Sequence, residues 1–175
     1  NTETIEAMTD EALDALKHGE VQQARHVLAL LASEIVITVT SIPLASYPAA
    51  VKAVVPLIDQ GKIEEAKAAL QSALSTLVEE RSVLPLPVLR AKLLLKRAEP
   101  LVEDGQRSEA SNERLETLLN EARQQLEMAE LLGYGKRKDF EPLYAELKKI
   151  KEKTGGGGCG KGWLDEVKAK LSRLF

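Results

Sequence analysis

Residues 16–44, LKHGEVQQARHVLALLASEIVITVTSIPL, recur at residues 58–86 as IDQGKIEEAKAALQSALSTLVEERSVLPL, after a shift of 42 positions and without a gap. The matched pairs include Gly19 with Gly61, Ala24 with Ala66, Leu28 with Leu70, Ser33 with Ser75, Val36 with Val78, and Pro43-Leu44 with Pro85-Leu86. Self-similarity at one fixed shift indicates an internal structural repeat.

A third, partial copy follows. The segment PLIDQGKIEEA (56–66) aligns with PLVEDGQRSEA (100–110), so the period is 42–44 residues. Each unit is expected to hold a helix that ends at Gly, whose left-handed conformation caps it, and then a longer helix that ends at Pro. The pattern therefore predicts a repeated helical hairpin.

One stretch of the repeat could form either a strand or a helix. The β-branched run EIVITVTSI (34–42) has strand propensity. Its copy, residues 76–84, carries Glu-Glu-Arg at the centre, which favours a helix end. We predict that both copies are helical and that 34–42 buries its Ile35, Val39 and Ile42 side.

The remaining apolar periodicity predicts helices at 3–18, at 109–132 closed by Gly133, at 138–153 and at 163–175. The fold class expected is all-α, an antiparallel helical bundle built from hairpin repeats. The expected organisation is a helical domain at 1–154, a flexible Gly-rich linker at 155–162 and a C-terminal amphipathic helix at 163–175. Pro56 and Pro100 each either kink a helix or begin a short final turn.

Composition excludes several classes of protein. The chain is 44% hydrophobic but only 3% aromatic, which suits an aliphatic helical core, and its net charge of −3 offers no basic field for nucleic acid. No apolar run is long enough to span a membrane. The single cysteine cannot form an internal disulfide. A start at Asn1 rather than Met fits a removed leader or a trimmed chain.

The segment GGGGCGKGW (155–163) comes close to a phosphate-binding loop, since Gly155, Gly160 and Lys161 fall in register. Such a loop needs a buried strand before it and a Ser or Thr after the lysine to bind Mg²⁺. Here a charged stretch, ELKKIKEKT, precedes it and Gly162 follows. No nucleotide and no other cofactor is therefore expected.

Other chemistry-bearing residues are sparse. His18 and His26 are expected on different helices, so they form no paired metal-ligand face, and Cys159 has no histidine near it in sequence. We therefore expect a protein that is not an enzyme, with no catalytic or metal-binding residues.

A polar cluster lies around the Pro43 turn. It comprises Thr38, Thr40, Ser41, Ser46 and Tyr47. Hydroxyls at a helix end mostly bond back to the backbone, but a small ligand-binding pocket is the other interpretation.

The last predicted helix carries a narrow apolar stripe. Its members are Trp163, Leu164, Val167, Leu171, Leu174 and Phe175. This stripe has three candidate destinations, namely the body of the protein, a neighbouring subunit or a membrane surface. Few positive charges and a short length favour docking on protein over docking on lipid.

These landmarks in order resemble the YfdX family of bacterial proteins. The resemblance rests on the G-x4-A turns at 19–24 and 61–66, the IPL and LPLP helix ends, LLNEARQQLEMAELLGYG (118–135) and the following DFEPLYAEL, and it spans residues 9–153. It implies an all-α periplasmic protein made with a secretory signal and associated with stress or acid response. It supplies no catalytic residues. On this basis we expect a non-enzymatic stress-response protein, a homo-oligomer, that binds small molecules or protein partners.

A tetratricopeptide-like adaptor that binds peptides is the alternative. Residues 15–35 look like half of such a unit. The tetratricopeptide period is 34 residues rather than 42–44, however, and its aromatic positions are unfilled here. A concave exposed groove would favour the adaptor, and a closed bundle would favour the first interpretation.

Overall fold

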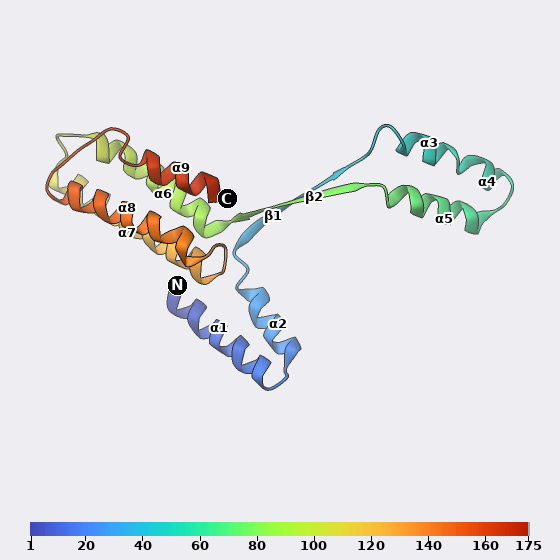
Figure 1. Ribbon diagram of the computed structural model, residues 1–175, viewed down its shortest axis with the longest axis horizontal. Coiled ribbons are helices and arrows are strands. Elements are labelled where there is room, and N and C mark those ends of the chain that lie inside the picture. The colour runs from blue at the N-terminus through green and yellow to red at the C-terminus, as the bar shows by residue number, and fades with distance from the viewer. Residues whose placement is uncertain (175) are drawn as a thin grey trace. The chain divides into compact units, whose positions relative to one another are not determined.

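The computed structural model describes residues 1–174, with Leu174 described by its backbone alone. The described chain is mostly helical and contains a two-stranded antiparallel sheet (Figure 1). In chain order the elements are α1 (Thr2–Lys17), α2 (Val21–Leu30), β1 (Glu34–Ser41), α3 (Tyr47–Lys52), α4 (Val55–Asp59), α5 (Ile63–Leu74), β2 (Val78–Pro85), α6 (Leu86–Glu103), α7 (Glu109–Leu131), α8 (Arg137–Gly155) and α9 (Asp165–Leu174).

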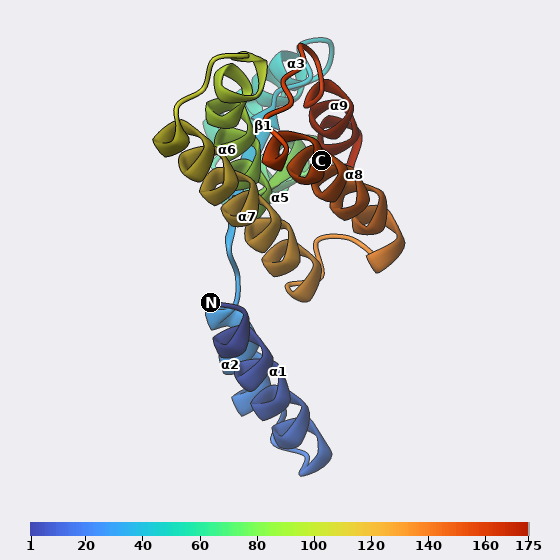
Figure 2. The ribbon, with the colours of Figure 1, turned by 90° about the vertical axis from the view of Figure 1, so that its left-hand side faces the viewer.

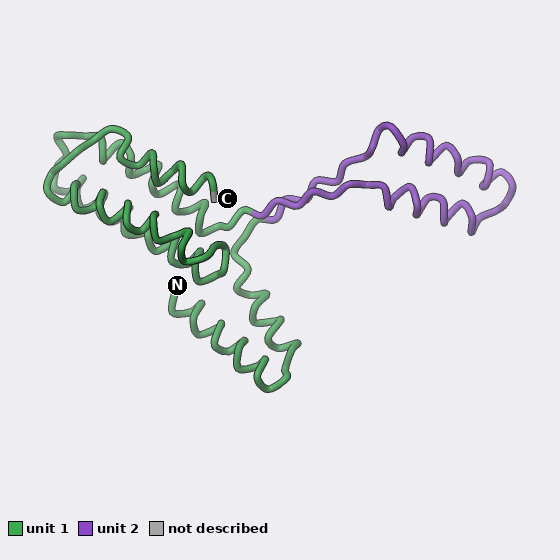
Figure 3. Tube along the Cα trace, viewed as in Figure 1, with its two compact units in different colours: residues 1–35, 84–175 green, residues 36–83 purple. Residues whose placement is uncertain are grey.

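The chain divides into two compact units, coloured separately in Figure 3. Unit 1 comprises residues 1–35 and 84–175, and unit 2 comprises residues 36–83. The two units differ in how well they are packed, as the distribution of buried residues shows.

Unit 1 contains a four-helix bundle in which α6 contacts α7 and α9, and α8 contacts α7 and α9 (Figure 2). Its core is aliphatic apart from Phe140, as the low aromatic content predicts. The buried cluster consists of Val88, Ala91, Leu95, Ala98, Val102, Leu115, Leu118, Leu119, Ala122, Leu126, Ala129, Phe140, Leu143, Leu147, Ile150, Leu164, Val167 and Leu171. All of these residues come from the last 92 positions of the chain, so the closed core lies outside the first two repeats.

The two copies of the repeat have the same local structure. Gly19 and Gly61 both have left-handed backbones, with φ of 77° and 70°, between a helix and the helix that follows. The next residue donates a comparable hydrogen bond in each copy: Glu20 N to Ala15 O at 2.8 Å, and Lys62 N to Leu57 O at 2.9 Å. The helical hairpins α1–α2 and α4–α5 are thus two versions of one unit.

The prediction that 34–42 and 76–84 are helical is wrong. Residues 34–41 form β1 and residues 78–85 form β2, and these two strands pair with each other. Nor are Ile35, Val39 and Ile42 buried, since they are 43%, 51% and 53% exposed. The Glu-Glu-Arg at the centre of β2 does not oppose a strand here, because those side chains are exposed and keep their hydration.

The all-α fold class is corrected accordingly to a mainly helical chain with a small sheet. The other predicted helices agree with α1, α7, α8 and α9 to within two residues at each end. Pro56 stands in the first turn of the short helix α4, whereas Pro100 lies inside α6. Gly133 has φ of 78° and follows the end of α7, as predicted.

Candidate interaction surface

Both helical hairpins expose apolar side chains at equivalent positions. In the first copy these are Leu13, Leu16, Val21 and Leu28, and in the second Val55, Ile58, Ile63 and Leu70; all are 40–54% exposed. Each set is related to the other by the same shift of 42 residues. We call these two sets the apolar stripes.

The stripes exist because each hairpin buries only one side of its helices. The small side chains of Ala24 and Ala66, at equivalent positions, are 1% and 5% exposed and allow the paired helices to approach closely. Few of the large hydrophobic residues of unit 2 are buried. Val54 is buried, whereas Leu74 and Val55 are more than half exposed. A hairpin of this size cannot bury its outer face unless a further element covers it.

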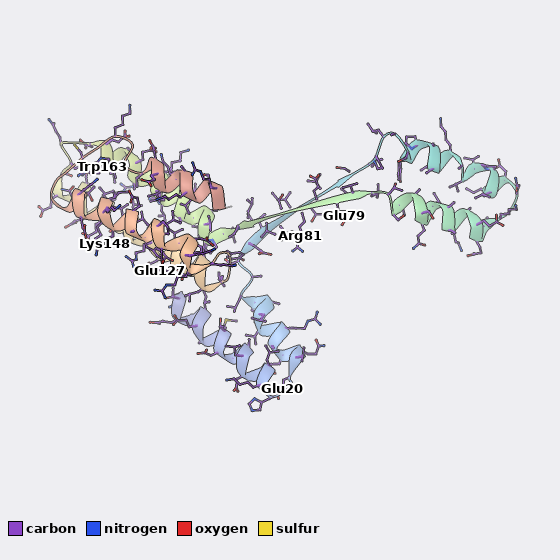
Figure 4. The ribbon with its side chains drawn as sticks, viewed as in Figure 1. Glu20, Glu79, Arg81, Glu127, Lys148 and Trp163 are labelled. Atoms are coloured by element: carbon purple, nitrogen blue, oxygen red, sulfur yellow. The ribbon has the colours of Figure 1, made fainter. Side chains whose placement is uncertain are left out.

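The strand pair is also apolar and exposed. Ser33 O accepts a hydrogen bond from Leu86 N at 2.8 Å, and with the bounds of the strands this places Glu34 opposite Pro85 and Ser41 opposite Val78. One face then carries Ile35, Ile37, Val39, Val78 and Leu84, together with Ser41, Glu80 and Ser82. The other face carries Val36 and Val83 among polar residues, including Glu79 and Arg81 (Figure 4).

Exposed apolar surface is concentrated in one part of the chain. Among the described side chains, 19 of the 23 large hydrophobic residues that are exposed lie in residues 1–83. Large exposed apolar patches on soluble proteins mark sites of interaction. These residues were not predicted from the sequence, although the internal alignment matches them pair by pair and so contained the signal.

The charged residues are also distributed unevenly between residues 1–83 and residues 84–175. Residues 1–83 contain 12 Asp and Glu against 6 Lys and Arg, together with His18 and His26. Residues 84–175 contain 15 Asp and Glu against 18 Lys and Arg. The apolar segment is therefore acidic at neutral pH, and it is the part whose charge reverses on acidification.

A cavity of about 320 Å³ lies where α1 and α2 approach the end of α7. Its lining includes Thr9, Leu28, Leu131 and Tyr134. The Tyr134 hydroxyl accepts a hydrogen bond from Ser33 N at 3.0 Å. Burial, with a smaller contribution from the neighbouring carboxylate of Glu34, raises the pKa of Tyr134 above its usual value. The cavity has a mixed polar and apolar lining and belongs to the joint between the first hairpin and the bundle.

The residues of the predicted polar pocket lie on different elements. Thr38, Thr40 and Ser41 lie on β1, Ser46 precedes α3, and Tyr47 is the first residue of α3. Thr38 and Thr40 share one face of the strand pair, while Ser41 lies on the other. All but the half-buried Tyr47 are exposed, and the cavities described in the structure are lined by other residues.

The apolar stripe of the last helix takes the first of its three predicted destinations, the body of the protein. Leu164, Val167 and Leu171 are at most 2% exposed and belong to the bundle core, and the half-buried Trp163 packs against it. Lys168 also pairs with Glu99 of α6. These buried side chains are not available to a partner or a lipid surface. The side chain of Leu174 and the whole of Phe175 lie outside the described residues.

The Gly-rich stretch, predicted to be a flexible linker, makes specific contacts. Gly160 N donates to Val102 O at 3.1 Å. The Arg107 guanidinium donates to Gly158 O at 2.6 Å and to Leu101 O at 2.7 Å, which joins this loop to the end of α6. A side chain at Gly160 would overlap the Trp163 ring.

The surroundings of this stretch also differ from those of a phosphate-binding loop. The segment before it is the helix α8, which continues to Gly155, and no strand precedes it. A phosphate-binding loop, in contrast, follows directly on a buried strand.

The histidines and the cysteine lie apart in the structure. His18 caps the end of α1, where its Nδ1 lies 2.9 Å from Asp14 O, and His26 lies in α2. Cys159 is exposed in the Gly-rich loop. Within residues 1–174, no group of three or more His, Cys, Asp or Glu side chains is arranged to hold a metal ion.

None of the helices in the described part of the chain combines the length and the apolar character needed to cross a membrane.

Comparison with known protein families matches one part of the chain, and this part also carries most of the exposed apolar side chains. The model of the YfdX protein family matches residues 1–83, which end where unit 2 ends. The match does not include residues 84–153, to which the resemblance also extended. Neither a curated protein nor a solved structure matches the chain. Residues 1–83, just under half of the chain, are therefore similar to the YfdX family.

Proposed function

We propose that this chain is a non-enzymatic stress-response protein of the periplasm, associated with acid, and that it binds protein through the exposed apolar surface of residues 1–83. The observation that carries the proposal is the concentration of exposed aliphatic side chains in the family-matched segment. In this arrangement the bundle α6–α9 is the stable scaffold and the repeats form the binding part. Homo-oligomer formation is part of the proposal, because a second copy can cover some of the same surface.

The association with acid has a physical basis in the charge of residues 1–83. At neutral pH the excess of carboxylates, which lies mainly in residues 1–35, hydrates the first hairpin and keeps it apart from other acidic surfaces. Acid protonates carboxylates, so it removes negative charge from the segment. The apolar stripes then become more prone to association in acid.

The competing function, a tetratricopeptide-like adaptor, is less well supported. A solenoid requires each unit to stack helix upon helix against the next one. Here each of the first two units ends in a strand, and the core of the protein is a closed four-helix bundle. We therefore favour the stress-response protein.

The experiment uses two side chains of nearly equal exposure. Ile58 in the second stripe is 53% exposed, and Leu93 on α6, outside the family-matched segment, is 54% exposed. We expect the full-length protein to suppress the aggregation of reduced, unfolded lysozyme, followed by light scattering between pH 7 and 4. Ile58→Ser should weaken the suppression and Leu93→Ser should not. Equal activity of both variants, or no suppression by the unaltered protein, would contradict the proposed function.

A further inference from the structure

The strand pair β1–β2 lacks the support that such a pair needs. An isolated two-stranded sheet is at best marginally stable in water, and it becomes stable when further strands or a covered apolar face are added. All the residues of β1 after Glu34 are exposed, and so are all those of β2 before Pro85. The pair also has two free edges, each with a row of unpaired backbone N–H and C=O groups.

The register shows which residues line each free edge. Ser33 bonds across to Leu86, so the odd-numbered residues of β1 direct their backbone groups toward β2 and the even-numbered residues direct theirs outward. The outer edge of β1 therefore presents Glu34, Val36, Thr38 and Thr40. The outer edge of β2 presents their cross-strand neighbours, which are Glu79, Arg81, Val83 and Pro85.

The two edges are unequally protected against further pairing. Charged residues and proline are the devices that prevent a free strand from pairing with another chain, and the edge of β2 has both in Glu79, Arg81 and Pro85. The edge of β1 has neither beyond Glu34 at its first position. Residues 35–40 are all β-branched and uncharged, which is the composition that favours strand pairing.

We propose that β1 pairs, antiparallel, with β1 of a second copy of this chain and so forms a four-stranded sheet across a two-fold axis. Only the even-numbered residues of β1 direct their backbone N–H and C=O groups away from β2, so only they can bond to the second copy. Even-numbered residues must therefore lie opposite even-numbered ones. The register that also matches the apolar face places Ile37 opposite its own copy and Ile35 opposite Val39. Glu34 then lies opposite Thr40 of the second copy, away from the other Glu34.

Unit 2 as a whole leaves apolar surface uncovered, and five of its exposed aliphatic residues lie on the strands themselves, namely Val36, Ile37, Val39, Val78 and Val83. Among its described side chains, 13 large aliphatic residues are 37–83% exposed. Full burial of such a side chain removes roughly 60–120 Å² from water, so together they leave on the order of 500 Å² uncovered. A stable protein pair buries about 800 Å² on each partner, of which somewhat more than half is apolar.

Charge also favours a second copy as the occupant. Residues 36–83 carry 4 Lys and Arg against 5 Asp and Glu, so two copies of unit 2 repel each other little. A strongly charged partner would find no complementary field on unit 2. This inference rests on the proposed function in one respect, since it takes the exposed apolar surface of residues 1–83 to be a binding surface.

The first test is cross-linking of single-cysteine proteins. In a full-length Cys159→Ser background, Ile37→Cys places two thiols on facing positions of the new strand pair, within reach of a disulfide. The matched control is Ser82→Cys, which lies opposite Ile37 on β2 and, like Ile37, is exposed. We expect copper-phenanthroline oxidation to produce several-fold more disulfide-linked dimer from Ile37→Cys than from Ser82→Cys.

The second test blocks each edge in turn. Thr38 and Arg81 face each other across the pair, and the backbone N–H of each points outward, so proline there removes no hydrogen bond of the β1–β2 ladder. We expect Thr38→Pro to halve the mass measured by light scattering and Arg81→Pro to leave it unchanged. Circular dichroism checks that both variants remain folded.

The outcomes separate this inference from the proposed function. A monomeric unaltered protein, or preferential cross-linking through Ser82→Cys, would overturn the pairing through β1. If such a protein still suppresses lysozyme aggregation, the proposed function stands without it. A dimer that cross-links through Ile37→Cys but fails to suppress aggregation would leave the pairing intact and overturn the proposed function.

Discussion

The hydroxyl of Tyr134, just after α7, accepts a hydrogen bond at 3.0 Å from the backbone N–H of Ser33, 101 residues earlier in the chain. Ser33 also accepts a bond from Leu86 N, so one residue joins the start of β1 to α6 and to the end of α7. These bonds attach the first repeat and the strand pair to the bundle within unit 1.

Loss of the Tyr134 hydroxyl should therefore weaken the protein. Tyr134→Phe leaves the Ser33 N–H without its partner, and we expect a loss of about 1–2 kcal/mol in the free energy of unfolding. Urea denaturation followed by circular dichroism measures it, with Tyr47→Phe in unit 2 as the control. An unchanged midpoint in Tyr134→Phe would show that water replaces the hydroxyl without loss.

The same tyrosine predicts a dependence on alkaline pH. The pKa of Tyr134 is raised in the folded protein, mainly by burial, so the folded state holds the proton more tightly than the unfolded state does. This contribution to stability is complete below the unfolded pKa of about 10 and is lost as the pH rises toward the folded pKa. Stability measured by urea denaturation between pH 8 and 11 should fall less in Tyr134→Phe than in the unaltered protein.

The glycines at the turns of the two repeats should be equally intolerant of a side chain. Gly19 and Gly61 have φ of 77° and 70°. Alanine at either position should cost about 1 kcal/mol, because a Cβ atom opposes the left-handed conformation. The control is Gly155→Ala, where φ is not left-handed and a Cβ would meet no atom within 4 Å. A loss at Gly155 as large as that at Gly19 would contradict this account.

Two neighbouring leucines on α6 should differ strongly in importance. Leu95 is completely buried in the bundle core, whereas Leu93 is 54% exposed. We expect Leu95→Ala to reduce stability by about 2–5 kcal/mol and Leu93→Ala to change it by less than about 0.5 kcal/mol. Thermal unfolding of the two variants side by side checks whether the bundle is the stable part of the chain.

The fluorescence of Trp163, the single tryptophan, should report the docking of α9. The Trp163 ring packs against the core, and the Lys153 Nζ lies 4.9 Å from the centroid of the ring. Because the ring is partly shielded from water, its emission should be blue-shifted in buffer. Anionic vesicles should not alter it, because the apolar face of α9 is already buried. Gly160→Ala should shift the emission to the red, while Gly156→Ala, whose added Cβ would have room, should not.

Acid should change the association of the protein. As carboxyl groups titrate, residues 1–83 change from net negative to net positive. Light scattering and the binding of an apolar dye should therefore change between about pH 6 and 4. Identical signals across that range would confine the acid association to the control of expression.

The helices of the bundle could be predicted from the sequence alone because their apolar residues recur with a helical period. Leu115, Leu119, Ala122 and Leu126 mark one face of α7, and the structure buries all of them. The repeat was also visible, since Gly19 and Gly61 require the same backbone whatever surrounds them. These features depend on neighbours within a few residues in the chain, so the sequence determines them locally.

Other features depended on residues far apart in the chain. The choice between helix and strand for 34–41 was settled by its pairing with 78–85, which allows Glu79, Glu80 and Arg81 to stay in water while the backbone bonds are made. The destination of α9 likewise depended on whether α6 and α8 left a gap for Leu164, Val167 and Leu171. Hydrogen bonding between strands and close packing between helices are non-local interactions, and only the tertiary structure brings their partners together.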